Sequence, residues 1–206
     1  MTFKLQEFTA SITNSGIAKT SVYEVMIMPP ASLGLSLNAQ KMLTLRCQDV
    51  QLPEIDFQVL PYYQKLVGPG ERRVVGMNQY KIIPVEFIVD KDLQIRSFFE
   101  NWMQRIVNYD SPSAYASIGG GQLPYEIAYK SDYVGTVDIR VWPNGMSTGQ
   151  DGDPPLVYQL QNAYPVNMGN VGLNWNNTDK AMILPIGFTY DTIKMPKMLR
   201  NYNSAQ

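Results

Sequence analysis

Histidine is absent from this 206-residue chain, and cysteine occurs once, at Cys47. Without histidine the sequence excludes Ser-His-Asp and Cys-His nucleophile activation, and it lacks the commonest general base and the commonest metal ligand. One cysteine excludes an intrachain disulfide, and one cysteine without histidine excludes the usual zinc sites. We therefore expect no metal, no cofactor and no enzymatic activity.

Charge is also scarce. Charged residues make up 17% of the chain, whereas a typical soluble domain has about 25%. The 17 Lys and Arg residues nearly balance the 18 Asp and Glu residues, which leaves a net charge of −1. A surface with few charges is weakly protected against association, so we expect an obligate oligomer. The chain has no excess of basic residues that would indicate a broad nucleic-acid-binding face.

Long apolar runs are missing as well. No stretch approaches the roughly 18 apolar residues that a membrane span requires, and the polar N-terminus MTFKLQEFTASITNSG shows no signal-peptide pattern. We expect a soluble protein, made in a reducing cytoplasm and without a membrane partner. Cys47 lies in the run KMLTLRCQDV without a basic cluster around it, so we expect a small core hydrophobe and not a reactive thiol.

Close carboxylate pairs and a glycine run are the remaining candidates for catalysis or phosphate binding. A glycosidase could use two carboxylates, but pairs at i and i+2 usually cap helices or form solvated turns. The pairs are Glu54 and Asp56, Asp90 and Asp92, and Asp151 and Asp153. The run 119–121 lacks the Lys-Ser/Thr that follows a P-loop. The enzyme hypothesis is therefore the weakest of those considered.

The segment from Val85 to Asn108 predicts the one convincing amphipathic helix, over about 91–108. Its large apolar residues recur at spacings of three and four, which places them on one broad face. We expect this face to pack on the core through Leu93, Phe98, Phe99, Trp102 and Ile106. Asp90 or Asp92 can cap the start of the helix, and Pro112 favours its end.

Most of the other segments alternate between apolar and polar residues, which predicts strands. The predicted strands are 22–28, 41–52, 79–89, 125–130, 133–142, 157–168, 171–175 and 181–190. Residues 54–76 contain two β-like stretches around a Gly-Pro-Gly turn and predict an extended hairpin. Residues 1–20 form an arm or short helix, and 192–206 form a C-terminal tail. We expect a single mainly β domain over 1–206, an antiparallel β-barrel or sandwich with one flanking helix.

The stretch 61–108 resembles the tail tube proteins of contractile-tailed bacteriophages. In that family an extended hairpin with a basic, glycine-containing turn precedes a strand, and an acidic turn then leads into a helix. The matching helix residues are Asp92, Ile95, Arg96, Phe99, Glu100 and Trp102. The later segments IRVW, YQLQNAYPVNM and PIGFTYD also occupy the family's positions. The resemblance covers roughly residues 20–192.

This resemblance implies a structural virion protein. Hexameric rings would stack into the inner tail tube, with the sheath and baseplate as partners, and genomic DNA would pass through the lumen without specific binding. The hairpin would make inter-ring contacts through Tyr62, Tyr63, Lys65, Arg72 and Arg73. The protein would assemble in the host cytoplasm and reside in the virion tail tube. A baseplate tube initiator or adaptor of the same fold, and a secreted tube protein like that of type VI secretion, remain alternatives.

Overall fold

The computed structural model describes residues 4–15, 20–34, 36–62, 70–78, 82–109, 125–142, 156–176 and 180–195. The strands are β1 (Tyr23–Met28), β2 (Cys47–Val50), β3 (Asp56–Tyr62), β4 (Glu71–Asn78), β5 (Ile83–Ile88), β6 (Gly135–Val141), β7 (Leu156–Met168), β8 (Ile183–Thr189) and β9 (Thr192–Lys194). The helices are α1 (Leu5–Ser15), α2 (Leu37–Leu45), α3 (Gln94–Ile106) and the short α4 (Lys130–Tyr133), and a 3₁₀ helix, η1, covers Ala31–Leu33.

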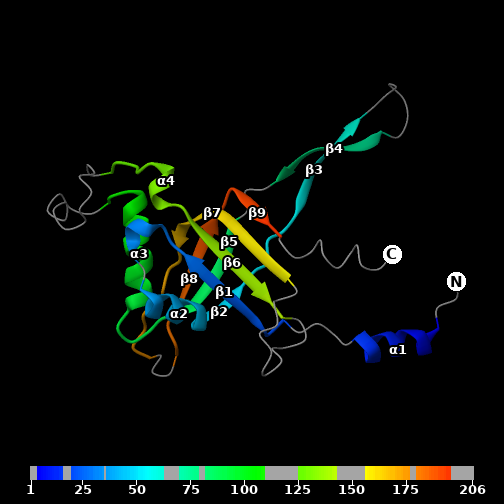
Figure 1. Ribbon diagram of the computed structural model, residues 1–206, viewed down its shortest axis with the longest axis horizontal. Coiled ribbons are helices and arrows are strands. Elements are labelled where there is room, and N and C mark those ends of the chain that lie inside the picture. Colours follow the sequence, from blue (N-terminus) through cyan, green and yellow to red (C-terminus); the bar gives the residue numbers. More distant parts are fainter. Residues whose placement is uncertain are drawn as a thin grey trace.

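Strand β7 connects two antiparallel sheets (Figure 1). Its first half pairs with β6 and β9, and its second half pairs with β8. The change falls at Asn162, which has a left-handed φ of 52° and is the extra residue of a β-bulge. We call the layer of β1, β6, β9 and the first half of β7 sheet A. Sheet B consists of the second half of β7 with β8, β5 and β2.

The outermost strands of the path, β1 and β2, approach each other and give the layers a barrel-like form. The strand order is β1-β6-β7-β8-β5-β2, and the Tyr23 hydroxyl on β1 donates a hydrogen bond to the Gln48 carbonyl oxygen on β2. The predicted mainly β fold of antiparallel strands with a flanking helix is therefore confirmed.

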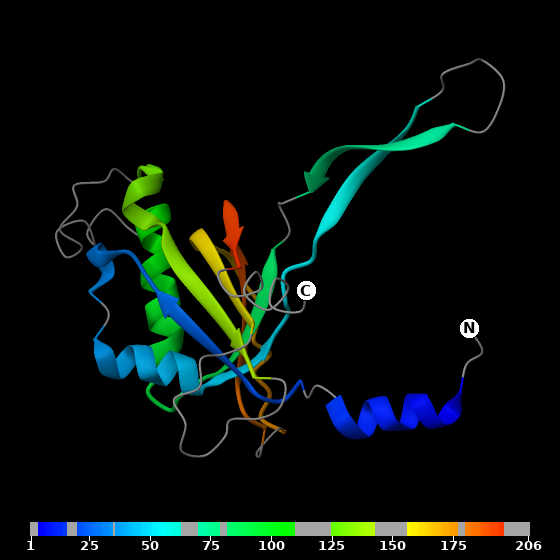
Figure 2. The same ribbon diagram turned by 45° about the vertical axis from the view of Figure 1, so that its right-hand side comes forward.

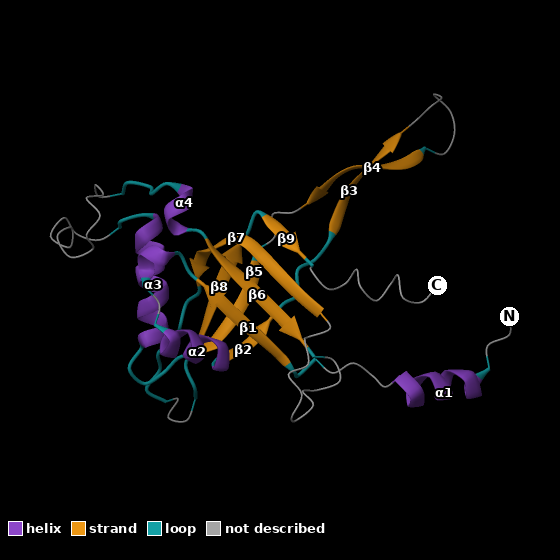
Figure 3. Ribbon diagram, in the orientation of Figure 1, coloured by secondary structure: helices purple, strands orange, loops and turns teal. Residues whose placement is uncertain are grey.

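The core lies between the two sheets and is completed by α3, which stands beside them (Figure 3). Alternate strand positions point inward, as the period of two requires. Ile95, Phe99 and Trp102 on α3 are fully buried against these positions. Aromatic rings connect helix and sheets, with centroids 5.2 Å apart for Phe87 and Phe99. Burying each such side chain stabilises the fold by roughly 1.5–3 kcal/mol.

The predicted helix core face needs one correction. Phe99 and Trp102 are buried, and Phe98 and Ile106 are partly buried against the core. Leu93 is 45% exposed because it precedes the first helical residue and has a left-handed φ of 54°. Its side chain therefore leaves the helical face, and Ile95 occupies the first core position instead. The helix is also shorter than predicted, since it spans Gln94–Ile106.

Residues 41–52 do not form the predicted strand. Helix α2 begins after its N-cap Ser36, whose Oγ accepts a hydrogen bond of 3.2 Å from the Ala39 N–H, and it continues to Leu45. Only the four residues of β2 remain extended. Cys47, at the start of β2, is half-buried and packs against the core.

Three other predictions are wrong or incomplete. Residues 125–130 give an isolated bridge between Val107 and Ile127, followed by α4, in place of a strand. The described residues 171–175 are not in a strand. The C-terminal segment begins with β9, which pairs with β7. The N-terminal arm contains α1, which stands apart from both sheets (Figure 2).

Candidate assembly surface

The hairpin of β3 and β4 is an extension of sheet B. Strands β2 and β5 pair within the barrel, and the Gln51 N–H reaches the Pro84 carbonyl oxygen at 3.4 Å where they diverge. The two chain segments that continue from β2 and lead into β5 pair again as β3 and β4, from Asp56 opposite Asn78 to Tyr62 opposite Glu71. Figures 1 and 2 show this second ribbon projecting beyond the barrel. Among the described residues, no layer of the chain therefore packs against the hairpin.

One face of the hairpin is apolar. The register places Phe57 opposite Met77 and Val59 opposite Val74, and these four residues are called the apolar face. Their exposed fractions are 53% for Phe57, 44% for Val59, 62% for Val74 and 41% for Met77. A two-stranded hairpin is marginally stable in water without a layer on its hydrophobic face. Exposed apolar surface of this kind marks a site of association.

The opposite face of the hairpin carries two of the predicted contact residues together. The Arg73 guanidinium lies 4.3 Å from the centre of the Tyr62 ring. Its Nη2 atom also donates to Glu71 Oε2 at 3.0 Å. Both the ion pair and the cation–π contact are solvent-exposed, so each contributes about 1 kcal/mol or less. They hold the arginine in one orientation at the outer part of the hairpin.

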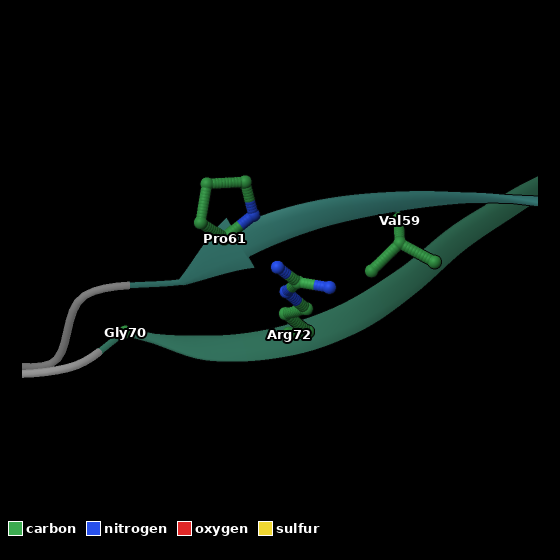
Figure 4. Close-up of a pocket in the computed structure, with 4 residues that line it drawn as sticks. All are labelled: Val59, Pro61, Gly70 and Arg72. Carbon is green, nitrogen blue, oxygen red and sulfur yellow. The ribbon is translucent and has the colours of Figure 1, made fainter.

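Arg72 projects from the same side of the hairpin as the apolar face. Figure 4 shows its side chain between Pro61 and Val59. These residues and Gly70 line an open hollow of about 460 Å³. Among the described residues, none of the carboxylates forms an ion pair with Arg72. Tyr63 and Lys65, the other predicted contact residues, lie outside the described part of the chain.

The outer face of sheet A is polar, and its Arg140 lies near two carboxylates. Arg140 approaches Glu24 at 3.4 Å and Asp138 at 3.7 Å. Gln159 Nε2 donates to Asp138 Oδ1 at 3.2 Å. Asp138 is only 7% exposed because its cross-strand neighbours cover it. This polar face can remain in contact with water without presenting a strong field of one sign.

Cys47 and Asp90, two of the groups considered for chemistry, have structural roles. Burial, with the nearby Asp49 charge adding to it, raises the pKa of the Cys47 thiol to about 12, so it stays protonated at neutral pH. Burial acts to raise the pKa of Asp90, but hydrogen bonds from the Ile95 and Gln94 N–H groups outweigh it and lower the pKa. Asp90 thus caps α3, whereas Asp151 and Asp153 lie outside the described residues.

No group of three or more Cys, Asp or Glu residues that could hold a metal ion occurs in the part of the chain that the structure describes. None of the described helices is long and apolar enough to cross a membrane.

The exposed apolar face is the feature that the sequence analysis missed. Residues 57 and 59 are apolar and are separated by the polar Gln58, and 74, 75 and 77 form a second apolar group across the turn. That pattern signals a half-buried hairpin. The sequence does not reveal that none of the described residues forms a layer over the hairpin, because this depends on where the hairpin projects.

Comparisons with known proteins agree on the fold. The family model described as "Phage tail tube protein" matches residues 18–195. Among curated proteins none matches the chain. A chain of the PVC sheath-tube complex in the extended state, a cryo-EM structure of an extracellular contractile injection system, has a TM-score of 0.57 and 10% identity, and the match covers 92% of this chain and 97% of that one.

Two other structures show the same fold. A chain of the anti-feeding prophage baseplate has a TM-score of 0.51 and 13% identity, with 86% of this chain and 94% of that one covered. A chain of the anti-feeding prophage tube-terminating cap also has a TM-score of 0.51, with 12% identity and coverages of 87% and 91%.

Proposed function

Because the chain belongs to the phage tail tube protein family, we propose that it is the structural subunit of the inner tube of a contractile tail. Copies would form hexameric rings that stack into a hollow conduit for genome ejection. The observation that carries this proposal is the projecting hairpin, whose apolar face is exposed on the isolated chain. A second copy can cover that face, and the subunit then has no need of catalytic groups or a cofactor.

The position of the hairpin supports a head-to-tail assembly. It leaves one end of the barrel (Figure 1), and we infer that the surface that receives it lies elsewhere on the neighbouring copy. Such a heterologous contact repeats from copy to copy and builds rings or filaments, whereas a self-complementary contact stops at a dimer. Stacked rings are one product of this geometry.

We assign the polar face of sheet A to the lumen of the tube. Its paired Glu24 and Arg140 side chains, each 30% exposed, can face water. DNA binding needs phosphate neutralisation by unpaired Lys or Arg, and this arginine is already engaged by carboxylates. DNA would therefore pass without being held. The outside of the tube would contact the sheath, its end would contact the baseplate, and assembly would occur in the host cytoplasm before incorporation into the virion.

Charge reversal on the hairpin tests the proposal. Arg72→Glu with Arg73→Glu should leave the circular dichroism spectrum and the melting temperature of the monomer unchanged, because both side chains are exposed. The same double variant should form no tubes by negative-stain electron microscopy. Lys41→Glu with Lys91→Glu makes the same change in net charge at exposed sites outside the hairpin and should assemble normally. Normal tubes from the hairpin variant would remove the hairpin from the contact.

A baseplate tube initiator is the second candidate. The same fold occurs in a chain of the baseplate structure described above. Copy number separates the two roles, because a tube subunit recurs along the whole tail and an initiator occurs in one ring. Quantitative mass spectrometry of purified particles measures this number.

A further inference from the structure

A second exposed apolar surface lies at the end of sheet B farthest from the hairpin. It consists of Ile88 on β5, Ile183 on β8, and Leu173 and Trp175 in the β7–β8 connection, and is called the far patch. Their exposed fractions are 37%, 36%, 82% and 99%, respectively. Ile88 and Ile183 are a cross-strand pair on the outer face of sheet B. A hollow of about 280 Å³ lined by Val171, Leu173, Met182 and Ile183 adjoins them.

The far patch and the hairpin lie at opposite ends of the same strand. Strand β5 begins at Ile83, on the side of the hairpin, and ends at Ile88, about 17 Å away at the usual rise per residue. Figure 1 shows the β7–β8 connection at the lower edge of the molecule and the hairpin at the upper edge. The described residues thus carry two exposed apolar surfaces, which lie toward opposite ends of β5.

Two carboxylates adjoin the far patch. Glu86 lies two residues before Ile88 on the same face of β5, and Asp49 on β2 is its cross-strand partner. Like charges directly opposite each other in a sheet destabilise it. Within the described residues, neither carboxylate forms an ion pair with a lysine or arginine. A cation supplied from outside the chain would relieve this repulsion.

Resting on the proposed function, we propose that the far patch of one copy receives the hairpin of a second copy, with Arg72 of the hairpin pairing with Glu86 and Asp49. Arg72 is two residues from Val74 along β4, which matches the separation of Glu86 and Ile88 along β5. The Val59–Val74 and Ile88–Ile183 pairs have similar widths, because both are antiparallel cross-strand neighbours, whose Cα atoms lie about 4.5–5.5 Å apart.

The match in spacing allows both interactions to form at once. When the two ribbon faces pack at the usual separation of about 10 Å, the valine pair covers the isoleucine pair and the arginine reaches the carboxylates. Trp175 and Leu173 then lie beside Phe57 and Met77 nearer the root of the hairpin. Repetition of this contact joins copies head to tail, which is the direction in which rings stack.

Charge reversal with rescue tests the pairing in the full-length chain. Arg72→Glu and Glu86→Arg, each alone, should lower the assembled fraction at least about tenfold, because each places like charges together. The two substitutions combined in one chain should restore assembly, because the pair is rebuilt with its signs exchanged. Monomer melting curves for each variant check that Glu86→Arg leaves the fold intact, and Lys41→Glu is the control for net charge.

Chemical cross-linking gives a second readout that does not depend on charge. In a Cys47→Ala chain, Val74→Cys with Ile88→Cys should yield a ladder of covalent multimers with a bismaleimide spanning about 10 Å, the separation of packed sheets. Val74→Cys with Lys41→Cys should give no ladder, because Lys41 lies on α2, outside the far patch.

The outcomes separate this inference from the proposed function. If the wild-type chain forms tubes but the double charge reversal fails to restore them and no ladder appears, the far patch is not the receiving surface and the tube assignment stands. A ladder that stops at closed dimers also overturns the inference. If the wild-type chain forms neither rings nor tubes, the proposed function fails, and this inference fails with it.

Discussion

The indole Nε1 of Trp102 donates a hydrogen bond of 2.8 Å to the backbone carbonyl oxygen of Tyr133. Trp102 is fully buried, and its ring lies 6.1 Å from that of Phe188 on β8. One side chain thus connects α3 with α4 and with sheet B. The helix is thereby fixed to the barrel.

Trp102→Ala should lower the free energy of unfolding by about 3–5 kcal/mol, since it empties a large buried site and leaves the Tyr133 carbonyl unpaired. Urea denaturation of the monomer measures the change. Trp175→Ala is the matched control, because this tryptophan is 99% exposed and its removal should change stability by less than about 0.5 kcal/mol. Equal stability of the two variants would contradict the described core.

Gly135→Ala should destabilise the junction of β1 and β6. A Cβ atom at Gly135 would lie 2.4 Å from the Met28 carbonyl oxygen and 3.2 Å from Trp102 Cζ2. Because backbone cannot move aside cheaply, we expect a loss of about 1–3 kcal/mol, as for overpacked cores. Thermal denaturation measures it. Gly172→Ala is the control, since its Cβ would meet nothing within 4 Å; a similar loss there would refute the steric explanation.

Asp90→Ala should cost about 0.5–2 kcal/mol at pH 7, the usual value of a helix cap. Asp90 accepts hydrogen bonds of 3.1 Å from the N–H groups of both Gln94 and Ile95. Asp92→Ala, at an exposed residue two positions later, is the control and should change stability by less than about 0.5 kcal/mol. Urea titrations of the three proteins measure these differences.

The Asp90 contribution should also depend on pH in one direction. The folded-state pKa is lowered, so it lies below the unfolded value of about 3.9. The stabilisation is complete above the unfolded pKa and is lost as the pH falls through the folded pKa. The difference between wild type and Asp90→Ala should therefore shrink below about pH 4. A difference that grew in acid would show that the carboxylate is not held in its charged form.

Removing apolar side chains from the hairpin should separate folding from assembly. Phe57→Ser with Val74→Ser should leave the melting temperature of the monomer nearly unchanged, because both residues are more than half exposed. The variant should remain monomeric by sedimentation velocity where the wild type sediments as large assemblies. Tyr125→Ser with Tyr129→Ser, at positions 74% and 83% exposed, is the control and should assemble. Tubes from the hairpin variant would contradict its role.

Strands with a clear alternation could be predicted from the sequence. The segments that became β1, β6 and β8 place apolar residues at every second position, and β7 does so over 156–160, before its bulge. The spacing of the aromatic residues likewise indicated α3. These signals are local, because each depends only on neighbours along the chain.

The errors arose where tertiary structure overrides a local pattern. Tyr125, Ile127 and Tyr129 alternate as a strand would, yet all three are at least 70% exposed, and only Ile127 is in a β-bridge. Leu43 on α2 is buried whereas Leu45 is 83% exposed, a difference that the run KMLTL does not reveal. Strand order and the projection of the hairpin depend on contacts between distant residues, and a sequence without register information cannot supply them.

Negative-stain electron microscopy of the purified full-length protein tests the central claim most directly. The account predicts hollow tubes or six-fold rings for the wild-type chain and isolated monomers for Arg72→Glu with Arg73→Glu. Wild-type particles that stay monomeric or form only two-fold dimers at every concentration, or tubes that form equally well from the hairpin variant, would contradict it.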